Sequence, residues 1–297
     1  MSATPGPAAG FRGATDRVLP STRALSIVII PFLLAAFVLL YFWPSADDTA
    51  RLFAWRITPG FTSMMLAAVY LGGAYFFVRV TVERQWHRVA GGFVAVGSFA
   101  TLMGIATILH WDKFIQTNVA FWVWSALYFV TPFLVFAVWL ANRQIAGSPD
   151  VDDLLLTDGT AIGIGVFGIV AVGTCLFLFL LPRVAIAVWP WPLTELTARV
   201  VGAIFALGGA GLGAFTERRW SSARILFQVE GGMLLLIGIG VIRGVGDFDP
   251  ARPLTWIFAA GFVALVGGSA VVYARMEASV AHGGWGPCVS APNRSAT

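Results

Sequence analysis

The sequence predicts an all-α integral membrane protein with eight transmembrane helices, arranged as two parallel four-helix repeats related by a pseudo-two-fold axis along the membrane normal. Three observations lead to this prediction: the composition, eight long apolar segments, and ordered matches between the two halves. Of the 297 residues, 58% are hydrophobic and 11% are charged, and the mean hydropathy is +0.81. Soluble domains contain about 25% charged residues, so this chain has too little polar surface to remain in water.

Eight segments are long and apolar enough to cross a bilayer as helices. A hydrocarbon core of about 30 Å requires about 20 residues in helical form, because no backbone N–H or C=O group can remain unpaired there. The sixth segment is the weakest, since it either includes Arg199 or is short. The eight expected helices cover residues 24–43, 60–78, 89–109, 119–140, 160–181, 196–215, 225–242 and 254–274.

The polar segments divide the chain into five expected parts. The two ends are rich in Pro, Gly, Ala and Ser and are expected to form disordered cytoplasmic tails. The first apolar segment is longer than the core of a secretory signal, so we expect it to be retained as a helix. The parts are a tail at 1–23, a repeat at 24–142, a cytoplasmic linker at 143–158, a repeat at 159–275 and a tail at 276–297.

The basic residues predict the orientation in the cell membrane. An even number of helices places both termini on one side, and with the termini in the cytoplasm twelve of the 19 Lys and Arg residues fall in cytoplasmic segments. Because these residues are concentrated on the cytoplasmic side of membrane proteins, both termini are expected there. Their scattering through short segments argues against nucleic-acid binding and leaves the lipid bilayer as the expected partner.

The tryptophans predict an aromatic belt at the outer membrane surface. The segment 182–197 contains Trp-Pro-Trp-Pro at 189–192, which is too rich in proline to continue a helix. We expect this segment to lie along the outer surface. Eight of the 12 tryptophans lie near expected outer ends: Trp43, Trp55, Trp111, Trp122, Trp124, Trp189, Trp191 and Trp256.

The two halves share ordered matches that indicate a duplication. Residues 55–74 match residues 191–210 at seven positions, including Leu-Gly-Gly-Ala in both segments. After a two-residue gap Glu-Arg-Gln-Trp at 83–86 aligns with Glu-Arg-Arg-Trp at 217–220, and the same offset pairs Trp122 with Trp256. Shared apolar bias is the alternative explanation. Because each half has four helices, both halves would have the same orientation.

No motif predicts a cofactor, a metal or a catalytic site. Gly163, Gly165 and Gly168 match a dinucleotide-binding fingerprint, but they lie within an apolar helix with no preceding strand. Close helix packing explains these glycines and the others better. His87 and His110 bracket one expected helix, about 35 Å apart at helical rise, so they cannot form a shared site. No Ser-His-Asp or paired-carboxylate arrangement follows from spacing.

A group of charged residues is expected at the outer ends of the helices. His110 and Asp112 close the third helix, Glu195 and Arg199 begin the sixth, and Arg243 ends the seventh. Arg199 and Arg243 lie in apolar helix ends, where a charge needs a partner. The group is either a set of surface ion pairs or a vestibule for a polar or zwitterionic ligand.

Glu230 is the most informative residue, because a carboxyl group within a membrane helix costs a few kcal/mol unless it has a partner. Gln228 accompanies it, and the aligned residues of the first half are Val96 and Val94. The two alternatives are a ligand-binding role and a structural ion pair with Arg84, Arg218 or Arg219. In both cases Glu230 is expected to face the protein interior.

Three hypotheses of function follow. The first is a transporter-like or permease-like protein for a small polar or amphipathic solute, bound between the halves by Glu230, Gln228 or the hydroxyls of Ser98, Thr101 and Thr107. The second is a sensor, assembly factor or subunit that acts through contacts with a membrane protein partner or lipid. The third is a membrane enzyme in which a carboxylate orients His110.

Overall fold

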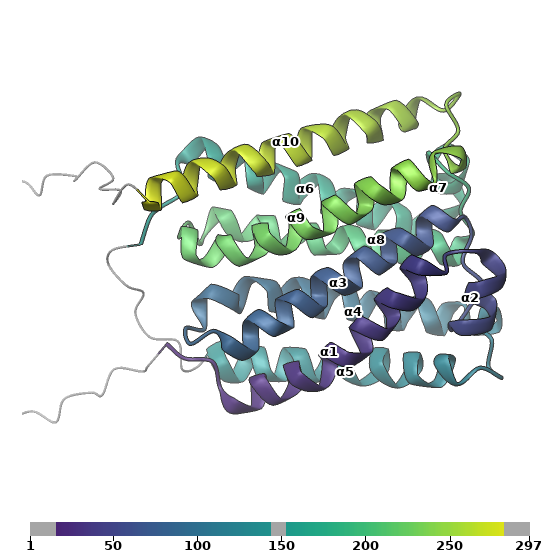
Figure 1. Cartoon of the computed structure of the whole chain (residues 1–297), viewed down its shortest axis with the longest axis horizontal. Helices are drawn as coiled ribbons and strands as arrows, with labels where there is room; N and C mark the ends of the chain where they lie inside the picture. The colour runs from purple at the N-terminus through teal and green to yellow at the C-terminus, as the bar shows by residue number, and fades with distance from the viewer. Residues whose placement is uncertain (1–15, 144–152, 282–297) are drawn as a thin grey trace, which may run out of the picture.

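The computed structural model describes residues 16–143 and 153–281, and within these ranges it is helical apart from one isolated bridge between Leu155 and Arg219 (Figure 1). Eight helices in the described part are long and apolar enough to span a membrane, as predicted. They are α1 (Pro20–Phe42), α3 (Gly60–Val82), α4 (His87–Leu109), α5 (Val119–Arg143), α6 (Asp158–Leu180), α8 (Glu195–Ala206) with its 3-10 continuation η2 (Leu207–Phe215), α9 (Trp220–Arg243) and α10 (Pro253–Ala281).

Short helices connect the long ones at one end of the bundle. They are α2 (Ala46–Leu52), η1 (Trp111–Lys113), α7 (Pro182–Val188) and η3 (Val245–Asp247). We call this the loop end, on the right in Figure 1. We call the opposite end, where α1 begins and α10 finishes, the terminal end. The disorder expected of the two tails concerns in part residues 1–15 and 282–297, which, like residues 144–152 of the linker, lie outside the described residues.

The long helices form a central group with an outer helix against each member. In the centre α3 packs on α9, and α4 packs on both α8 and α9. Outside them, α1 packs on α3, α5 on α4, α6 on α8 and η2, and α10 on α9. α3 is therefore the most enclosed span, because 78% of its most apolar 18-residue stretch is buried. No residue of α10 is buried.

At both ends of the described chain, packed structure extends beyond the helices that the sequence predicts. Residues 276–281, expected in the C-terminal tail, belong to α10, where Glu277 accepts hydrogen bonds from the Trp220 indole (2.9 Å) and the Arg224 guanidinium (2.5 Å) of α9. At the other end Val18 is buried, and its N–H donates to the Arg84 carbonyl (3.0 Å). α1 begins at Pro20, since proline is favoured in the first helical turn.

The expected outer aromatic belt is only half present. Of the eight tryptophans, four are exposed (Trp43, Trp111, Trp122 and Trp256) and four are buried (Trp55, Trp124, Trp189 and Trp191). Trp191 is fully buried, and its indole N–H donates to the Thr62 hydroxyl (3.0 Å). A satisfied indole N–H allows the large ring to contribute to the core.

The segment 182–197, expected to lie along the outer surface, is exposed only in part. Residues 182–188 form α7, in which Val184 and Val188 are exposed, whereas the following Trp189 and Trp191 enter the core between the halves. Pro182 is the first residue of α7, a position that requires no backbone N–H and tolerates proline.

Candidate functional site

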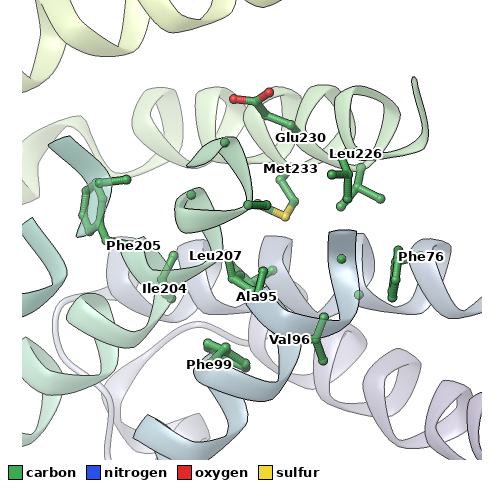
Figure 2. Close-up of a pocket in the computed structure, with 18 of the residues that line it drawn as sticks. Phe76, Ala95, Val96, Phe99, Ile204, Phe205, Leu207, Leu226, Glu230 and Met233 are labelled. Carbon is green, nitrogen blue, oxygen red and sulfur yellow. The ribbon is translucent and has the colours of Figure 1, made fainter. Parts of the chain in front are cut away.

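A cavity of about 1490 Å³ lies among the helices and is lined by residues of all eight spans. We call it the central cavity. Its lining is mostly aliphatic and aromatic, and Figure 2 shows part of this wall with Phe76, Phe99 and Phe205. Ser98, Thr101 and Thr107, which were expected to line a solute cavity, are not among the lining residues. The hydroxyls of Thr101 and Thr107 instead donate to carbonyls of their own helix.

Glu230 of α9 brings a carboxyl group into this apolar wall. In Figure 2 the carboxyl lies on the side of α9 opposite to Met233, Leu226 and the aromatic wall with Phe76 and Phe99, so it lines another part of the cavity. The Ser269 hydroxyl of α10 donates to it at 3.4 Å. Within the described residues Glu230 forms no ion pair, so the expected structural pairing with a terminal-end arginine does not occur.

Two of the three arginines proposed as partners of Glu230 bind other carboxylates. Arg218 pairs with Asp158, the first residue of α6, and Arg219 pairs with Glu217 two residues before it. Glu217 lies between η2 and α9, and although burial alone would raise its pKa, the hydrogen bonds from Arg219 hold the pKa below its usual value. Neither of these two arginines therefore pairs with Glu230.

Glycines leave space along the wall of the central cavity. Gly163 of α6, Gly213 of η2 and Gly268 of α10 all line the central cavity, and a Cβ atom added at any of them would meet nothing within 4 Å. The expectation that the glycines serve close packing is wrong for these three. It holds for Gly168, where an added Cβ would lie 2.8 Å from the backbone of Leu212.

Gln228 does not share the site of Glu230. Its side-chain oxygen accepts hydrogen bonds from the Tyr75 hydroxyl (2.8 Å) and from Arg79 (3.2 Å) of α3, and its amide donates to the Tyr273 hydroxyl (3.0 Å) of α10. With all of these contacts made, Gln228 links α3, α9 and α10. It does not line the central cavity.

At the loop end the structure brings together three of the predicted residues, His110, Arg199 and Glu195. Arg199 donates to His110 Nε2 at 2.6 Å, although the two residues are 89 positions apart. Glu195 lies 3.8 Å from Arg199 and accepts a hydrogen bond from Arg183 at 2.8 Å. Burial and the neighbouring Arg199 charge lower the pKa of His110, which suits a neutral imidazole that accepts a hydrogen bond.

The remaining loop-end residues have separate structural contacts. Asp112 is exposed and pairs with Lys113 at 2.7 Å, and this hydrogen bond lowers the pKa of Asp112. Arg243 donates to the Tyr41 carbonyl at the end of α1 (3.0 Å). Asp247 accepts from the Phe61 N–H at the start of α3 (3.0 Å). Capping of helix ends thus explains Arg243, which the sequence could place only in a charged group, and also Asp247.

No described carboxylate is hydrogen-bonded to His110, so the arrangement required for an enzyme with His110 as acid or base is not formed. The guanidinium of Arg199 occupies Nε2. Among residues 16–143 and 153–281, no three His, Cys, Asp or Glu side chains are placed to hold a metal ion.

The terminal end holds a polar cluster that sequence spacing did not reveal. His87, at the start of α4, contacts Asp16 through Nδ1 and the Ser221 hydroxyl through Nε2 (3.1 Å), and Ser221 donates to Asp153. Asp16 also accepts from the His87 backbone N–H (3.1 Å), and Asp153 from that of Ser221 (3.4 Å). Asp16 and Asp153 therefore cap the N-terminal ends of α4 and α9, where the side chains of His87 and Ser221 contact each other.

The composition of this cluster resembles a Ser-His-Asp triad, but the hydroxyl geometry differs from that of a nucleophile. Ser221 donates its proton to Asp153, whereas a nucleophilic serine donates to the histidine. The only signal in the sequence is the Glu-Arg-x-Trp element that precedes both helices.

Comparison of the chain with protein-family models, curated proteins and solved structures found no match.

Proposed function

We propose that this protein is a permease-like membrane protein that binds an amphipathic molecule, with an apolar body and an amine head, in the central cavity. The observation that supports this proposal most directly is the carboxyl of Glu230 in a mostly apolar cavity, with Ser269 as its one described hydrogen-bond partner.

The walls favour an amphipathic ligand over a small polar one. Ligand pockets usually have volumes of about 300–1,000 Å³, and the central cavity, at about 1490 Å³, has room for a long chain or several rings. A polar solute requires many hydrogen-bonding groups, because each unpaired polar group is costly in an apolar site. An apolar chain requires none.

The head group follows from the charge of the site. A carboxylate within the bilayer is unfavourable unless a partner compensates it. An amine supplies both a positive charge and hydrogen-bond donors, and charge-assisted hydrogen bonds are about twice as strong as neutral ones. A ligand with a carboxylate head would be repelled.

We also propose that the two halves arose by duplication and are related by a pseudo-two-fold axis. Equivalent hydrogen bonds at aligned positions support this. The indole N–H groups of Trp122 and Trp256 each donate to the carbonyl six residues earlier, at 3.0 and 3.1 Å. The backbone N–H groups of Ile115 and Asp249 donate to the segments after α2 and α7, at 2.8 and 2.9 Å.

The alignment allows Glu230 and Ser269 to be compared with the residues at the equivalent positions of the first half. The offset that pairs Trp122 with Trp256 pairs Glu230 with Val96 and Ser269 with Val135. Val135 is fully buried, and Val96 packs against the same cluster. The polar pair therefore replaces an apolar pair of the first half, and this supports a role beyond packing.

The test compares ligands that differ only in the head group. Purified protein in vesicles is titrated with a long-chain alkylamine, with the alcohol of the same chain and with the carboxylate. Glu230→Gln should weaken amine binding at least tenfold, about 1.4 kcal/mol, and leave alcohol binding unchanged. Asp158→Asn, which removes an exposed carboxylate, is the control. Equal amine binding by both variants would contradict the proposal.

Uptake separates a permease from a binding protein. Vesicles that contain the protein should release or accumulate the amine faster than empty vesicles, and Glu230→Gln should remove the difference. Binding without faster movement would contradict the permease-like part of the proposal and retain the binding site.

A second function, contact with a membrane protein partner, is supported by α10. This span has no buried residue, and Val263 on it is 70% exposed. A photo-crosslinking side chain at position 263 should react with a protein in native membranes. Adducts with lipid alone would contradict this second function.

A further inference from the structure

A second pocket, with a volume of about 370 Å³, lies at the terminal end, where α3, α4, α9 and α10 converge on the residues before α6. We call it the terminal-end pocket. It differs from the central cavity because charged side chains make up a large part of its lining. These are Arg79, Glu83, Arg88, Asp153 and Arg224.

Two arginines of this pocket share one distant carboxylate. Glu83 is shared by Arg79 at 3.7 Å and Arg88 at 3.6 Å, which are long distances for hydrogen bonds. It also accepts from the Arg84 backbone N–H at 3.0 Å. Neither Arg79 nor Arg88 therefore forms a short ion pair with Glu83.

The other two charged residues of the lining have contacts of their own. Arg224 binds Glu277 at 2.5 Å, and Asp153 accepts from the Ser221 hydroxyl. Among the three arginines of the lining, Arg79 and Arg88 therefore have the longest carboxylate contacts. The Nε atoms of both guanidinium groups are buried, and in the described structure neither has a hydrogen-bond partner.

We infer that the terminal-end pocket binds a phosphate group. Guanidinium groups present planar sets of donors that match phosphate oxygens. A phosphate in the pocket would add anionic acceptors beside two guanidinium groups whose shared carboxylate lies 3.6–3.7 Å away. Arg79 lies in the last turn of α3 and Arg88 in the first turn of α4, which is the depth of phospholipid headgroups. Basic pockets between membrane helices bind such headgroups.

The experiment measures binding of short-chain phosphatidic acid to the full-length protein in a neutral detergent by calorimetry. Short-chain phosphatidylcholine and inorganic phosphate are titrated separately. Phosphatidic acid should bind, and Arg79→Gln and Arg88→Gln should each weaken its binding about tenfold or more. Arg143→Gln is the control, because Arg143 is exposed at the same end and stacks over Trp139 outside the pocket.

The outcomes separate the sources of the phosphate. Preference for phosphatidic acid over inorganic phosphate identifies a lipid headgroup, and equal affinity identifies a soluble phosphate compound. Equal binding of phosphatidic acid by all three variants, or equal affinity for phosphatidylcholine and phosphatidic acid, would overturn the inference. Thermal unfolding of Arg88→Gln checks that the fold is retained, since the one carboxylate contact of Arg88 within residues 16–143 and 153–281 is the long one to Glu83. Amine binding at Glu230 provides an independent readout.

Discussion

Glu230 and Ser269 can be tested by making them like the residues at the aligned positions of the first half. A polar pair that serves stability should lower stability when it is replaced. A polar pair that serves a ligand should not, because the isolated carboxyl group is itself unfavourable within the bilayer. The packed valines at positions 96 and 135 indicate that this fold accommodates an apolar pair.

We expect Glu230→Val with Ser269→Val to raise the free energy of unfolding by about 1–3 kcal/mol and to abolish amine binding. Thermal unfolding in detergent and the alkylamine titration measure the two effects. Ser269→Val alone is the control, because it leaves the carboxyl without its hydroxyl partner and should lower stability. A double variant that is less stable than the parent would assign the pair a structural role.

His110 gives the loop end a dependence on pH. Burial and the Arg199 charge lower its pKa below the ordinary value of 6.5. At pH values below about 6.5, His110 therefore binds a proton more readily in the unfolded chain than in the folded protein. The stability contribution is complete above about pH 6.5 and decreases as the pH falls from there toward the lowered pKa of the folded state.

We expect the unfolding temperature to decrease as the pH is lowered from about 7 to about 5. The variant His110→Asn should show a smaller decrease. The measurement is thermal unfolding of both proteins across this range at constant salt. His87→Asn is a useful comparison, since His87 contacts the Asp16 carboxylate rather than a guanidinium. Parallel pH curves for the parent and His110→Asn would contradict the assignment.

At the scale of elements, the segment from α7 to Trp191 joins the two halves. Trp191 contacts Phe61 of α3 with ring centroids 4.8 Å apart and donates to Thr62 of the same helix. The C-terminal end of α7 is held by Arg252, which donates to the carbonyl of Ile186 (3.2 Å). Trp191, which belongs to a segment predicted to lie on the membrane surface, is thus part of the core.

Trp191→Ala should therefore destabilise the protein by about 3–5 kcal/mol, because it opens a cavity in a buried cluster. Trp256→Ala should change stability by less than about 0.5 kcal/mol, since Trp256 is 65% exposed. Thermal unfolding of both variants in the same detergent gives the comparison. Similar losses from both variants would indicate that Trp191 lies at the membrane surface.

At the scale of the whole molecule, the sequence predicted the properties that depend on local composition. Eight spans follow from length and hydropathy, and all eight are present. The contact of Arg199 with His110 joins residues 89 positions apart, and no local pattern predicts it. The open space at Gly163 was missed for the same reason, because a glycine in an apolar helix has the same sequence signal whether a neighbouring helix approaches it or not.

The orientation of the bundle is the remaining whole-molecule prediction. The positive-inside distribution predicts that the terminal end lies in the cytoplasm, and the terminal-end pocket would then contact the leaflet that is rich in anionic lipids. Two exposed threonines between long helices mark opposite ends of the molecule: Thr117 at the loop end and Thr216 at the terminal end.

Each threonine is replaced by cysteine in a chain whose Cys175 and Cys288 are serine. A membrane-impermeant maleimide applied to intact cells should label Thr117→Cys, because the loop end is expected to face outward. It should label Thr216→Cys only after the membrane is permeabilised. Permeabilised cells also provide the control, since both variants should then react. Labelling of Thr216→Cys in intact cells, with Thr117→Cys protected, would reverse the orientation and place the phosphate site in the outer leaflet.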